Sequence, residues 1–463
     1  MPGNIVRNPA GSSGEWQPAA SETAGFAPRR GRACRGGMRY HVLVKCEDDI
    51  ARGSGRPFSP EAVRADFPVL HRQVRGKPLV YLDSATTSQK PASVIRAGCD
   101  YYGACNANVH RAFHHLAEQA TRRYEEVRAS TARFLDAADP REIVFTRGTT
   151  EGINLVAHGW ARKFLRPGDT VLLTEMEHHS NLVPWQLAAQ TTGASLRHVP
   201  VLDDGTLDLP AFARLLDGTA KLVAVTQMSN VLGTVNPVRE IAAAAHAAGA
   251  LVLVDAAQSV PHRPVSVREL GCDFLAFSGH KMCGPTGIGG LWARAGLLEA
   301  MDPFQGGGEM IDRVGLDAST WAEVPHKFEA GTPNIAGVFG LGAALEYLEA
   351  AGREPLAAYE RELTAGAVAR LREVPGLRLF GDAPDRGGQL SFDVEGVHPH
   401  DLAQFLDSEG IAIRAGHLCC QPLMRRLGVS ALSRASLMFY NLPAEIDTLA
   451  AAVERARRYF GGA

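Results

Sequence analysis

The chain has 463 residues, of which 45% are hydrophobic and 21% are charged, and its formal net charge at pH 7 is −2. This length is more than one ordinary core accommodates, so we expect at least two domains in a globular protein. The near-neutral charge gives no argument for binding to nucleic acid or to an anionic membrane. The apolar stretch at 241–257 is interrupted too often for a transmembrane helix.

The cysteine pattern favours a reducing compartment. In a chain this long the cysteines do not resemble a disulfide framework, and no pair has the spacing of a zinc finger. We therefore expect a cytoplasmic protein without a metal site. The eight cysteines are Cys34, Cys46, Cys99, Cys105, Cys272, Cys283, Cys419 and Cys420.

Residues 1–56 differ in composition from the rest of the chain. They are rich in Gly, Pro, Ser and Arg and have little apolar periodicity, which predicts a disordered extension. They contain no apolar core for a secretory signal, and Glu15 and Glu22 weigh against a transit peptide. Met38 is an alternative start, and 40–46 alternates like a short strand.

The folded part begins near residue 58. Ser59 is a plausible helix N-cap with Pro60 at the first helical position, and we expect the segment 57–75 to pack with the C-terminal domain. A large domain at 76–338 follows, with an extended segment at 80–84 and a helix over about 117–135. Further on, alanine-rich helical segments alternate with short continuous apolar runs, which predicts a mainly parallel sheet covered on both faces. These runs are 143–146, 171–174, 222–226, 251–254 and 274–277.

A smaller α+β domain is predicted at 339–463. A helix stripe appears at Tyr359, Leu363, Ala367, Leu371 and Val374, with spacings of four and three residues. The segments 388–394, 400–409 and 411–414 then form a strand–helix–strand pattern. The fold class is therefore α/β, with a large sheet domain and a smaller C-terminal one.

Lys281 follows the apolar run 274–277 and lies in the glycine-rich stretch 278–289. A strand that ends at such a turn presents its last side chains at the carboxyl edge of the sheet, where open α/β folds bind ligands. A partly desolvated lysine there can form a Schiff base with a carbonyl cofactor. The alternative is an ordinary solvated loop lysine.

Other polar residues follow the predicted strands in the same way. Asp255 can keep a pyridine nitrogen protonated, or it can cap a helix. The segment 146–152 offers hydroxyl and N–H groups at a helix N-terminus, which suits a phosphate but is also typical of a turn with an N-cap. His178 can stack on a ring or move protons, although most histidines are structural. Asn230 offers an amide to a ring hydroxyl or a substrate.

The order of these motifs resembles the fold-type I pyridoxal-phosphate enzymes of the class V aminotransferase group. The segments 414–423, 433–436 and 439–441 narrow the resemblance to the SufS-type (group II) cysteine desulfurases, over roughly residues 58–460. The resemblance implies pyridoxal phosphate on Lys281, a homodimer, and Cys419 as the sulfur acceptor. It implies that the cofactor ring is contacted by His178, Asp255 and Gln258 and that its phosphate is held by Thr149, Thr150, Ser278 and His280. It also implies that the substrate is bound by Asn230 and Arg434. The segment 328–334 matches a segment of the family that reaches the cofactor phosphate of the neighbouring subunit. The resemblance therefore implies that Thr332 lies at that phosphate.

The sequence departs from that family at three places. The usual His-His-Cys-Ala is His417-Leu418-Cys419-Cys420, and the N-terminal extension lies outside the family core. Cys283, which we expect to be a small hydrophobe, stands where the family has an aromatic or aliphatic residue after Lys-Met. Because neighbouring residues of an extended loop point in opposite directions, either one thiol attacks and the other is buried, or the second thiol accepts sulfur from the first after a loop movement. The favoured interpretation makes Cys420 a structural substitute for alanine, so that Cys420→Ala keeps most activity.

The implied activity converts L-cysteine to L-alanine and leaves a persulfide on Cys419, which passes to an acceptor or scaffold of iron–sulfur assembly. The activated thiol must be accessible. The alternatives are a selenocysteine lyase or an aminotransferase of the same fold, or a non-catalytic sulfur carrier. A plain aminotransferase does not need Cys419.

Overall fold

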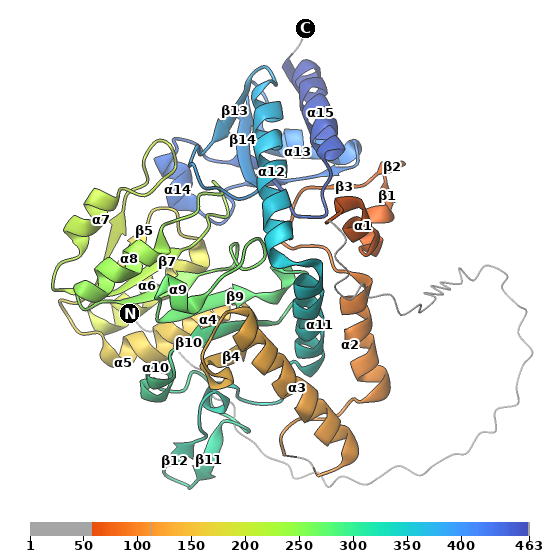
Figure 1. The fold of residues 1–463 in the computed structure, drawn as a ribbon. Helices are drawn as coiled ribbons and strands as arrows, with labels where there is room; N and C mark the ends of the chain where they lie inside the picture. The colour runs from red at the N-terminus through yellow and green to blue at the C-terminus, as the bar shows by residue number, and fades with distance from the viewer. Residues whose placement is uncertain (1–57, 112, 462–463) are drawn as a thin grey trace, which may run out of the picture. The chain divides into compact units, whose positions relative to one another are not determined.

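The computed structural model describes residues 58–461 apart from residue 112, and these belong to one compact unit, Ala51–Ala463 (Figure 1). The predictions made for residues 1–56 lie outside the described residues. At the start of the described part, helix α1 (Pro60–Ala65) begins after Ser59, whose Oγ accepts a hydrogen bond from the Ala62 N–H at 3.3 Å. The predicted cap is therefore confirmed.

The central element is a seven-stranded sheet in the order β4-β10-β9-β8-β7-β5-β6. All neighbours are parallel except that β10 runs antiparallel to both β4 and β9, so the prediction of a mainly parallel sheet is confirmed. All five predicted strands are present, and β6 and β10 were not foreseen. The strands are β4 (Ile143–Thr146), β5 (Thr170–Thr174), β6 (Ser195–Val199), β7 (Ala220–Thr226), β8 (Leu251–Asp255), β9 (Phe274–Ser278) and β10 (Gly289–Ala293).

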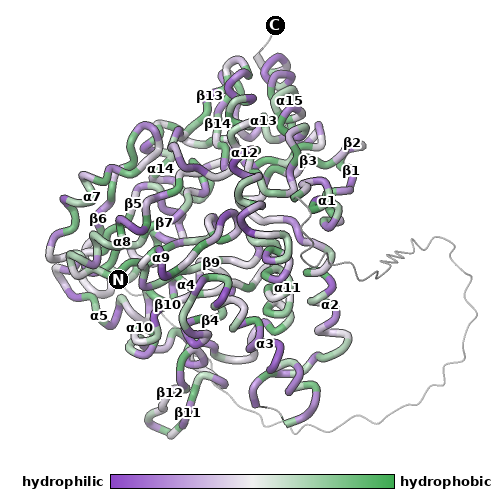
Figure 2. Tube along the Cα trace, in the orientation of Figure 1, coloured by the Kyte–Doolittle hydropathy of each residue, from purple (hydrophilic) through white to green (hydrophobic). Residues whose placement is uncertain are grey.

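Both faces of this sheet are covered, because alternate strand residues enter two separate apolar clusters. Val223 and Val225 of β7 pack in one cluster, and Leu222 and Ala224 pack in the other. Helices that contribute to the first cluster include α2 (Ala92–Ala104), α3 (His115–Phe134), α8 (Val238–Ala247) and α11 (Ile335–Ala351). Helices that contribute to the second cluster include α4 (Thr149–Val156), α6 (Val183–Thr192) and α10 (Ala295–Ala300). Helix α11 is buried along most of its length, in keeping with its mainly hydrophobic colour in Figure 2.

A second, antiparallel sheet has the order β13-β14-β17-β16. Because β14 and β16 both pair antiparallel with β17, they run parallel to each other with β17 between them. Its elements are β13 (Leu377–Phe380), β14 (Gln389–Val394), β16 (Arg414–Gly416), β17 (Leu432–Ser436) and the helices α12 (Arg353–Arg372), α13 (Pro399–Ser408) and α15 (Pro443–Gly461). The predicted last strand at 411–414 was wrong in its bounds, since residues 411–412 form a separate short strand and β16 begins at Arg414. The predicted stripe on α12 is buried at Leu363, Ala367 and Leu371.

The N-terminal elements attach to this second sheet. Strand β3 (Val80–Tyr81) pairs in parallel with β15 (Ile411–Ala412). The Arg64 guanidinium of α1 binds the Glu445 carboxylate at 3.0 Å. These contacts bring Asp83, just after β3, beside Ser436 of β17.

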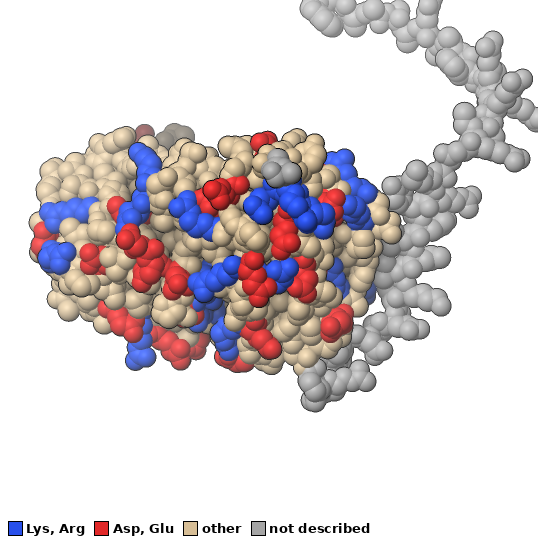
Figure 3. All heavy atoms as spheres, turned by 90° about the horizontal axis from the view of Figure 1, so that it is seen from above, with Lys and Arg blue, Asp and Glu red and all other residues tan. Residues whose placement is uncertain are grey.

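The remaining surface shows two further features. The hairpin of β11 (Ile311–Val314) and β12 (Ser319–Trp321) exposes Leu316 and Trp321. Figure 3 shows basic and acidic side chains interspersed on the face seen from above, so this face does not carry charge of a single sign.

No single helix of the described residues is long and apolar enough to cross a bilayer. Helices α11 and α12 together have the length and composition of a membrane span, but the pair is bent by 76°.

Candidate active site

A cavity of about 510 Å³ lies at the carboxyl ends of the central strands. The loops after β4, β5, β7, β8 and β9 supply most of its walls. The rest comes from Ala85 and Thr86, His400 of α13, the segment 414–419 and Arg434 of β17. Thr332 is the one residue among the predicted site residues that does not line it. Those that do are Thr149, Thr150, His178, Asn230, Asp255, Gln258, Ser278, His280, Lys281, Cys419 and Arg434.

One end of the cavity is built for an anion. Helix α4 begins at Thr149 after Gly148, which provides no side-chain cap. The Ser278 Oγ accepts a hydrogen bond from the Thr149 N–H at 2.9 Å and lies 2.7 Å from the Thr149 Oγ1. The Thr149 N–H is therefore engaged by Ser278, and the next N–H groups of the helix start, together with the two hydroxyls, fit a phosphate.

Lys281 and Asp255 lie at the floor of the cavity. Asp255 is the last residue of β8, and its Oδ1 accepts a hydrogen bond from the Ala257 N–H at 2.9 Å. Burial raises the pKa of Asp255, and the charge of Lys281 opposes this shift. Burial lowers the pKa of Lys281, which Asp255 partly restores. A lysine with a lowered pKa has more free amine for attack on a carbonyl cofactor.

The turn that carries Lys281 is anchored by a segment that the sequence analysis did not single out. The His280 carbonyl oxygen accepts hydrogen bonds from the Lys90 Nζ at 2.8 Å and from the Ser88 N–H at 3.0 Å. The Ser88 Oγ also accepts from the Cys283 N–H at 2.8 Å. Cys283 itself is fully buried, as expected for a small hydrophobe. No local pattern in the sequence would have revealed this anchor, because it joins residues some 190 positions apart.

His178 is neutral at physiological pH. Its Nδ1 accepts a hydrogen bond from the Ser180 N–H at 3.1 Å, which assigns the proton of the neutral ring to Nε2. Burial and the charge of Lys281 lower its pKa to about 3. A neutral ring at this place suits stacking on an aromatic cofactor better than a charged one.

Glu177, next to His178, is fully enclosed and was given no role by the sequence analysis. Its carboxyl accepts hydrogen bonds from the Thr174 Oγ1 at 2.7 Å, the Asn181 Nδ2 at 2.6 Å and the Thr226 N–H at 3.1 Å. Burial raises its pKa to about 8, despite these hydrogen bonds. The residue therefore ties the end of β5 to the end of β7 and fixes the backbone before His178.

Arg434 reaches the cavity from the second sheet. Its Nη1 donates to the Asn230 carbonyl oxygen at 2.8 Å, and its Nη2 donates to the Thr86 Oγ1 at 2.9 Å and to Asp83 at 3.3 Å. Its Nε is buried and has no hydrogen-bond partner in the described part of the chain. Because an unpaired buried donor is costly, a substrate carboxylate fits here.

The loop of the two adjacent thiols is a left-handed turn, so the expectation of an extended loop was wrong. The φ angles of Leu418 and Cys419 are 52° and 55°. The Cys419 carbonyl oxygen accepts a hydrogen bond from the His179 N–H at 2.8 Å. The two thiols still point apart, because Cys419 is exposed at the cavity and Cys420 is fully buried.

Thr332 lies in a different cavity, of about 420 Å³, which is also lined by Tyr124, Phe145 and Glu329. Here the buried Arg128 guanidinium binds the Glu329 carboxylate at 2.7 Å. Within one chain, Thr332 therefore does not face the same space as Lys281.

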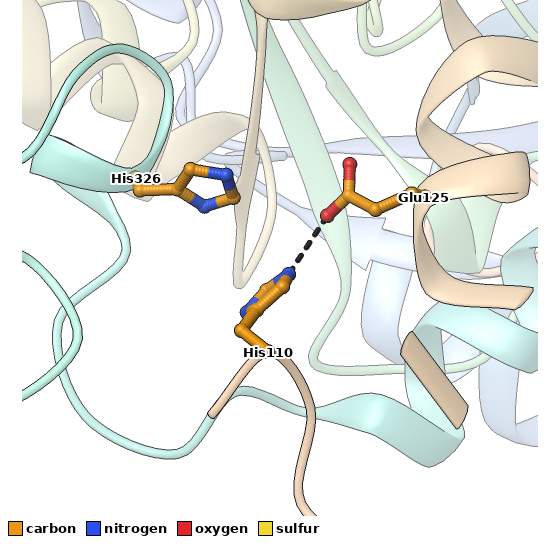
Figure 4. Close-up of side chains that lie close together, drawn as sticks. All are labelled: His110, Glu125 and His326. Carbon is orange, nitrogen blue, oxygen red and sulfur yellow. Dashed lines mark hydrogen bonds and ion pairs between the residues drawn. The ribbon is translucent and has the colours of Figure 1, made fainter. Parts of the chain in front are cut away.

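Near this second cavity, ligand atoms of His110, Glu125 and His326 lie within 4.8 Å of one another (Figure 4). The His110 Nε2 is 2.8 Å from the Glu125 Oε1, and the Arg128 Nε binds the Glu125 Oε2 at 2.9 Å. Burial alone would raise the pKa of Glu125, but the hydrogen bond from His110 and the charge of Arg128 lower it to about 2. Arg128 thus already supplies Glu125 with the positive charge that a cation would bring.

Comparisons with known proteins agree on one family. The family described as Aminotransferase class-V matches residues 80–449. A curated relative from Halalkalibacterium halodurans, named "Probable cysteine desulfurase", is 53% identical over 395 residues, which is 85% of this chain and 97% of the relative.

Solved structures give the same result. The crystal structure of the cysteine desulfurase CsdA from Escherichia coli is 42% identical, has a TM-score of 0.82, and matches 88% of this chain and 100% of that one. A structure of a C-DES mutant with glycine covalently linked to its pyridoxal-phosphate cofactor is 26% identical, with a TM-score of 0.74 over 84% of this chain and 98% of that one.

Proposed function

The chain belongs to the class V aminotransferase family, and from this premise we propose that it is a pyridoxal-phosphate-dependent cysteine desulfurase that takes sulfur from L-cysteine and releases L-alanine. The observation that carries the proposal is the position of Cys419. This exposed thiol stands at the same cavity as Lys281, Asp255 and Arg434. A thiol is the group that sulfur transfer needs and that a plain aminotransferase does not use.

The cofactor fits the donor set of the cavity. Lys281 would hold it covalently, Asp255 would pair with the ring nitrogen, and His178 and Gln258 would contact the ring. Thr149, Thr150, Ser278 and His280 would hold the phosphate at the start of α4. When bound, pyridoxal phosphate supplies an electron sink for cleavage of bonds at the substrate's α-carbon.

The protein's own residues would do the rest. Arg434 and Asn230 would hold the substrate carboxylate, and the amine of Lys281 would move the α-proton, helped by its lowered pKa. The Cys419 thiolate would attack the substrate sulfur. An S–S bond to Cys419 then forms as the carbon–sulfur bond breaks, and protonation of the carbon fragment yields alanine.

Several finer points belong to the same proposal. We place the chain in the SufS-type group, as a cytoplasmic homodimer in which Thr332 faces the partner's phosphate. The sulfur acceptor is a protein of iron–sulfur assembly. The functional division is a segment at 57–75, a cofactor domain at 76–338 and a small domain at 339–463 that carries Cys419. A preference for L-selenocysteine is the second candidate, since selenium would occupy the same place as sulfur.

The test measures alanine and sulfide from L-cysteine, with and without a thiol acceptor. The wild-type protein should release both, and Cys419→Ser should form no persulfide, because a hydroxyl is a far weaker nucleophile than a thiolate. Alanine release from L-selenocysteine that persists in Cys419→Ser would favour the second candidate. Transamination without alanine release would refute the proposal.

A further inference from the structure

The Cys420 thiol makes a hydrogen bond that substitution by alanine would remove. Its side chain is fully buried, and its Sγ lies 3.1 Å from the Asn230 Oδ1 and 3.9 Å from the Met176 carbonyl oxygen. Both acceptors belong to segments that follow strands of the central sheet. The thiol hydrogen has acceptors within reach, which weighs against the expectation from the sequence that Cys420 merely substitutes for alanine and that Cys420→Ala keeps most activity.

Asn230 uses the two ends of its amide on the two neighbours of Cys419. Its Nδ2 donates to the Leu418 carbonyl oxygen at 2.8 Å, and its Oδ1 faces the Cys420 thiol. An amide oxygen only accepts and an amide nitrogen only donates, so the Leu418 carbonyl oxygen fixes the orientation of the amide, and the Cys420 thiol donates to the amide oxygen as a second anchor. The Asn230 backbone is itself held, because the Arg434 Nη1 donates to its carbonyl oxygen.

We propose that Cys420 is a positioning residue for Cys419, which acts by locking the Asn230 side chain across the loop. This inference rests on the proposed function for its catalytic consequence. Leu418 and Cys419 both have positive φ angles, a backbone region that residues other than glycine adopt only when neighbouring contacts hold them there. The two hydrogen bonds of Asn230 span this turn on either side of Cys419. The amide nitrogen has a second hydrogen, so Asn230 can still face a substrate in the cavity.

A sulfur relay from Cys419 to Cys420 is the competing interpretation. In a relay the Cys420 sulfur would attack the outer sulfur of the Cys419 persulfide, so that the Cys420 persulfide forms and the Cys419 thiolate leaves. That step requires Cys420 to turn out of its buried position and to give up the hydrogen bond to Asn230. The geometry favours a thiol that holds the loop.

The experiment compares Cys420→Ala, Cys420→Ser and Cys420→Val in the full-length holoenzyme. Serine keeps a donor to the Asn230 Oδ1, and valine fills the space without one. Cys272→Ala, which removes a buried thiol elsewhere, is the control for the loss of a buried thiol as such. It should leave both persulfide formation and hydrogen exchange in the loop unchanged. Two quantities are measured: the rate of Cys419 persulfide formation in a single turnover, and amide hydrogen exchange of the peptide that contains 414–424.

Alanine and valine should slow persulfide formation by about three- to ten-fold, the range expected for one net hydrogen bond, and should also raise KM for L-cysteine, because Asn230 faces the substrate. They should also speed hydrogen exchange in the loop, and serine should restore both quantities. Wild-type rates and exchange in Cys420→Val, no rescue by serine, or a persulfide found mainly on Cys420 would each overturn the proposal. If the proposed function is wrong, the wild-type protein will release no alanine from L-cysteine. Hydrogen exchange would then still test whether Cys420 holds the loop.

Discussion

The raised pKa of Glu177 predicts a specific dependence of stability on pH. Its ordinary value is 4.5 and the folded value is about 8, because burial disfavours the charged carboxylate. A group whose folded pKa is raised stabilises the fold below its unfolded pKa, and this contribution is lost as the pH rises from 4.5 to about 8. Glutamine at this position cannot ionise, so Glu177→Gln removes the effect.

The magnitude follows from the same shift. One pKa unit corresponds to about 1.4 kcal/mol, so wild-type stability should fall relative to Glu177→Gln by about 3 kcal/mol between pH 5.5 and 8. In addition, Glu177→Gln should lose about 1 kcal/mol of stability at every pH, because the Asn181 Nδ2 would face the NH2 group of the glutamine instead of a carboxyl oxygen.

The assay is denaturant unfolding of the two proteins at matched pH, because their difference cancels the titrations that they share. Glu409→Gln is the control. Hydrogen bonds from Lys77 and Arg455 lower the pKa of Glu409, so its stabilising contribution is lost only below its unfolded pKa of 4.5, and its difference from wild type should be flat from pH 5.5 to 8. A flat difference for Glu177→Gln as well would refute the reasoning, since it would mean that Glu177 is charged within the fold.

Two further predictions concern the cofactor and the N-terminal extension. Lys281→Ala should lose the yellow, borohydride-reducible chromophore of the wild type; a variant that kept it and still turned over would show that another amine holds the cofactor. A protein that starts at Gly55 should release alanine at a near-normal rate, because every predicted site residue lies after Asp83. A large loss of activity on this truncation would show that the first residues support the core.

The sequence predicted most of the central sheet because buried parallel strands are continuous apolar runs. It missed β6, whose Ser195, Arg197 and His198 lie in an edge strand with one neighbour. It missed β10 because that strand begins with Gly289 and Gly290. These glycines are required by packing, since a Cβ at Gly289 would collide with the Phe277 carbonyl oxygen.

The candidate site was predictable where a residue follows its own strand, as Asp255 and Lys281 do. Contacts between distant segments were not. The partners of Arg434 depend on the approach of β3 to β17, and those of His280 on the segment around Ser88. The conformation of the Cys419 loop also escaped prediction, because nothing local in Leu418 or Cys419 favours a positive φ.

Burial decides which groups in the cavity carry charge. Burial and the charge of Lys281 lower the pKa of His178 to about 3 and that of His280 to about 4, so both rings are neutral at pH 7. Arg434 keeps its charge, because a guanidinium does not deprotonate in proteins. A phosphate at the start of α4 is therefore held by N–H and hydroxyl donors, whereas a carboxylate beside β17 meets a fixed positive charge. Neither of these two ends changes its charge between pH 6 and 8, whereas the pKa values of about 8 for Glu177 and Lys90 place the titration of these two neighbours at the upper end of that range.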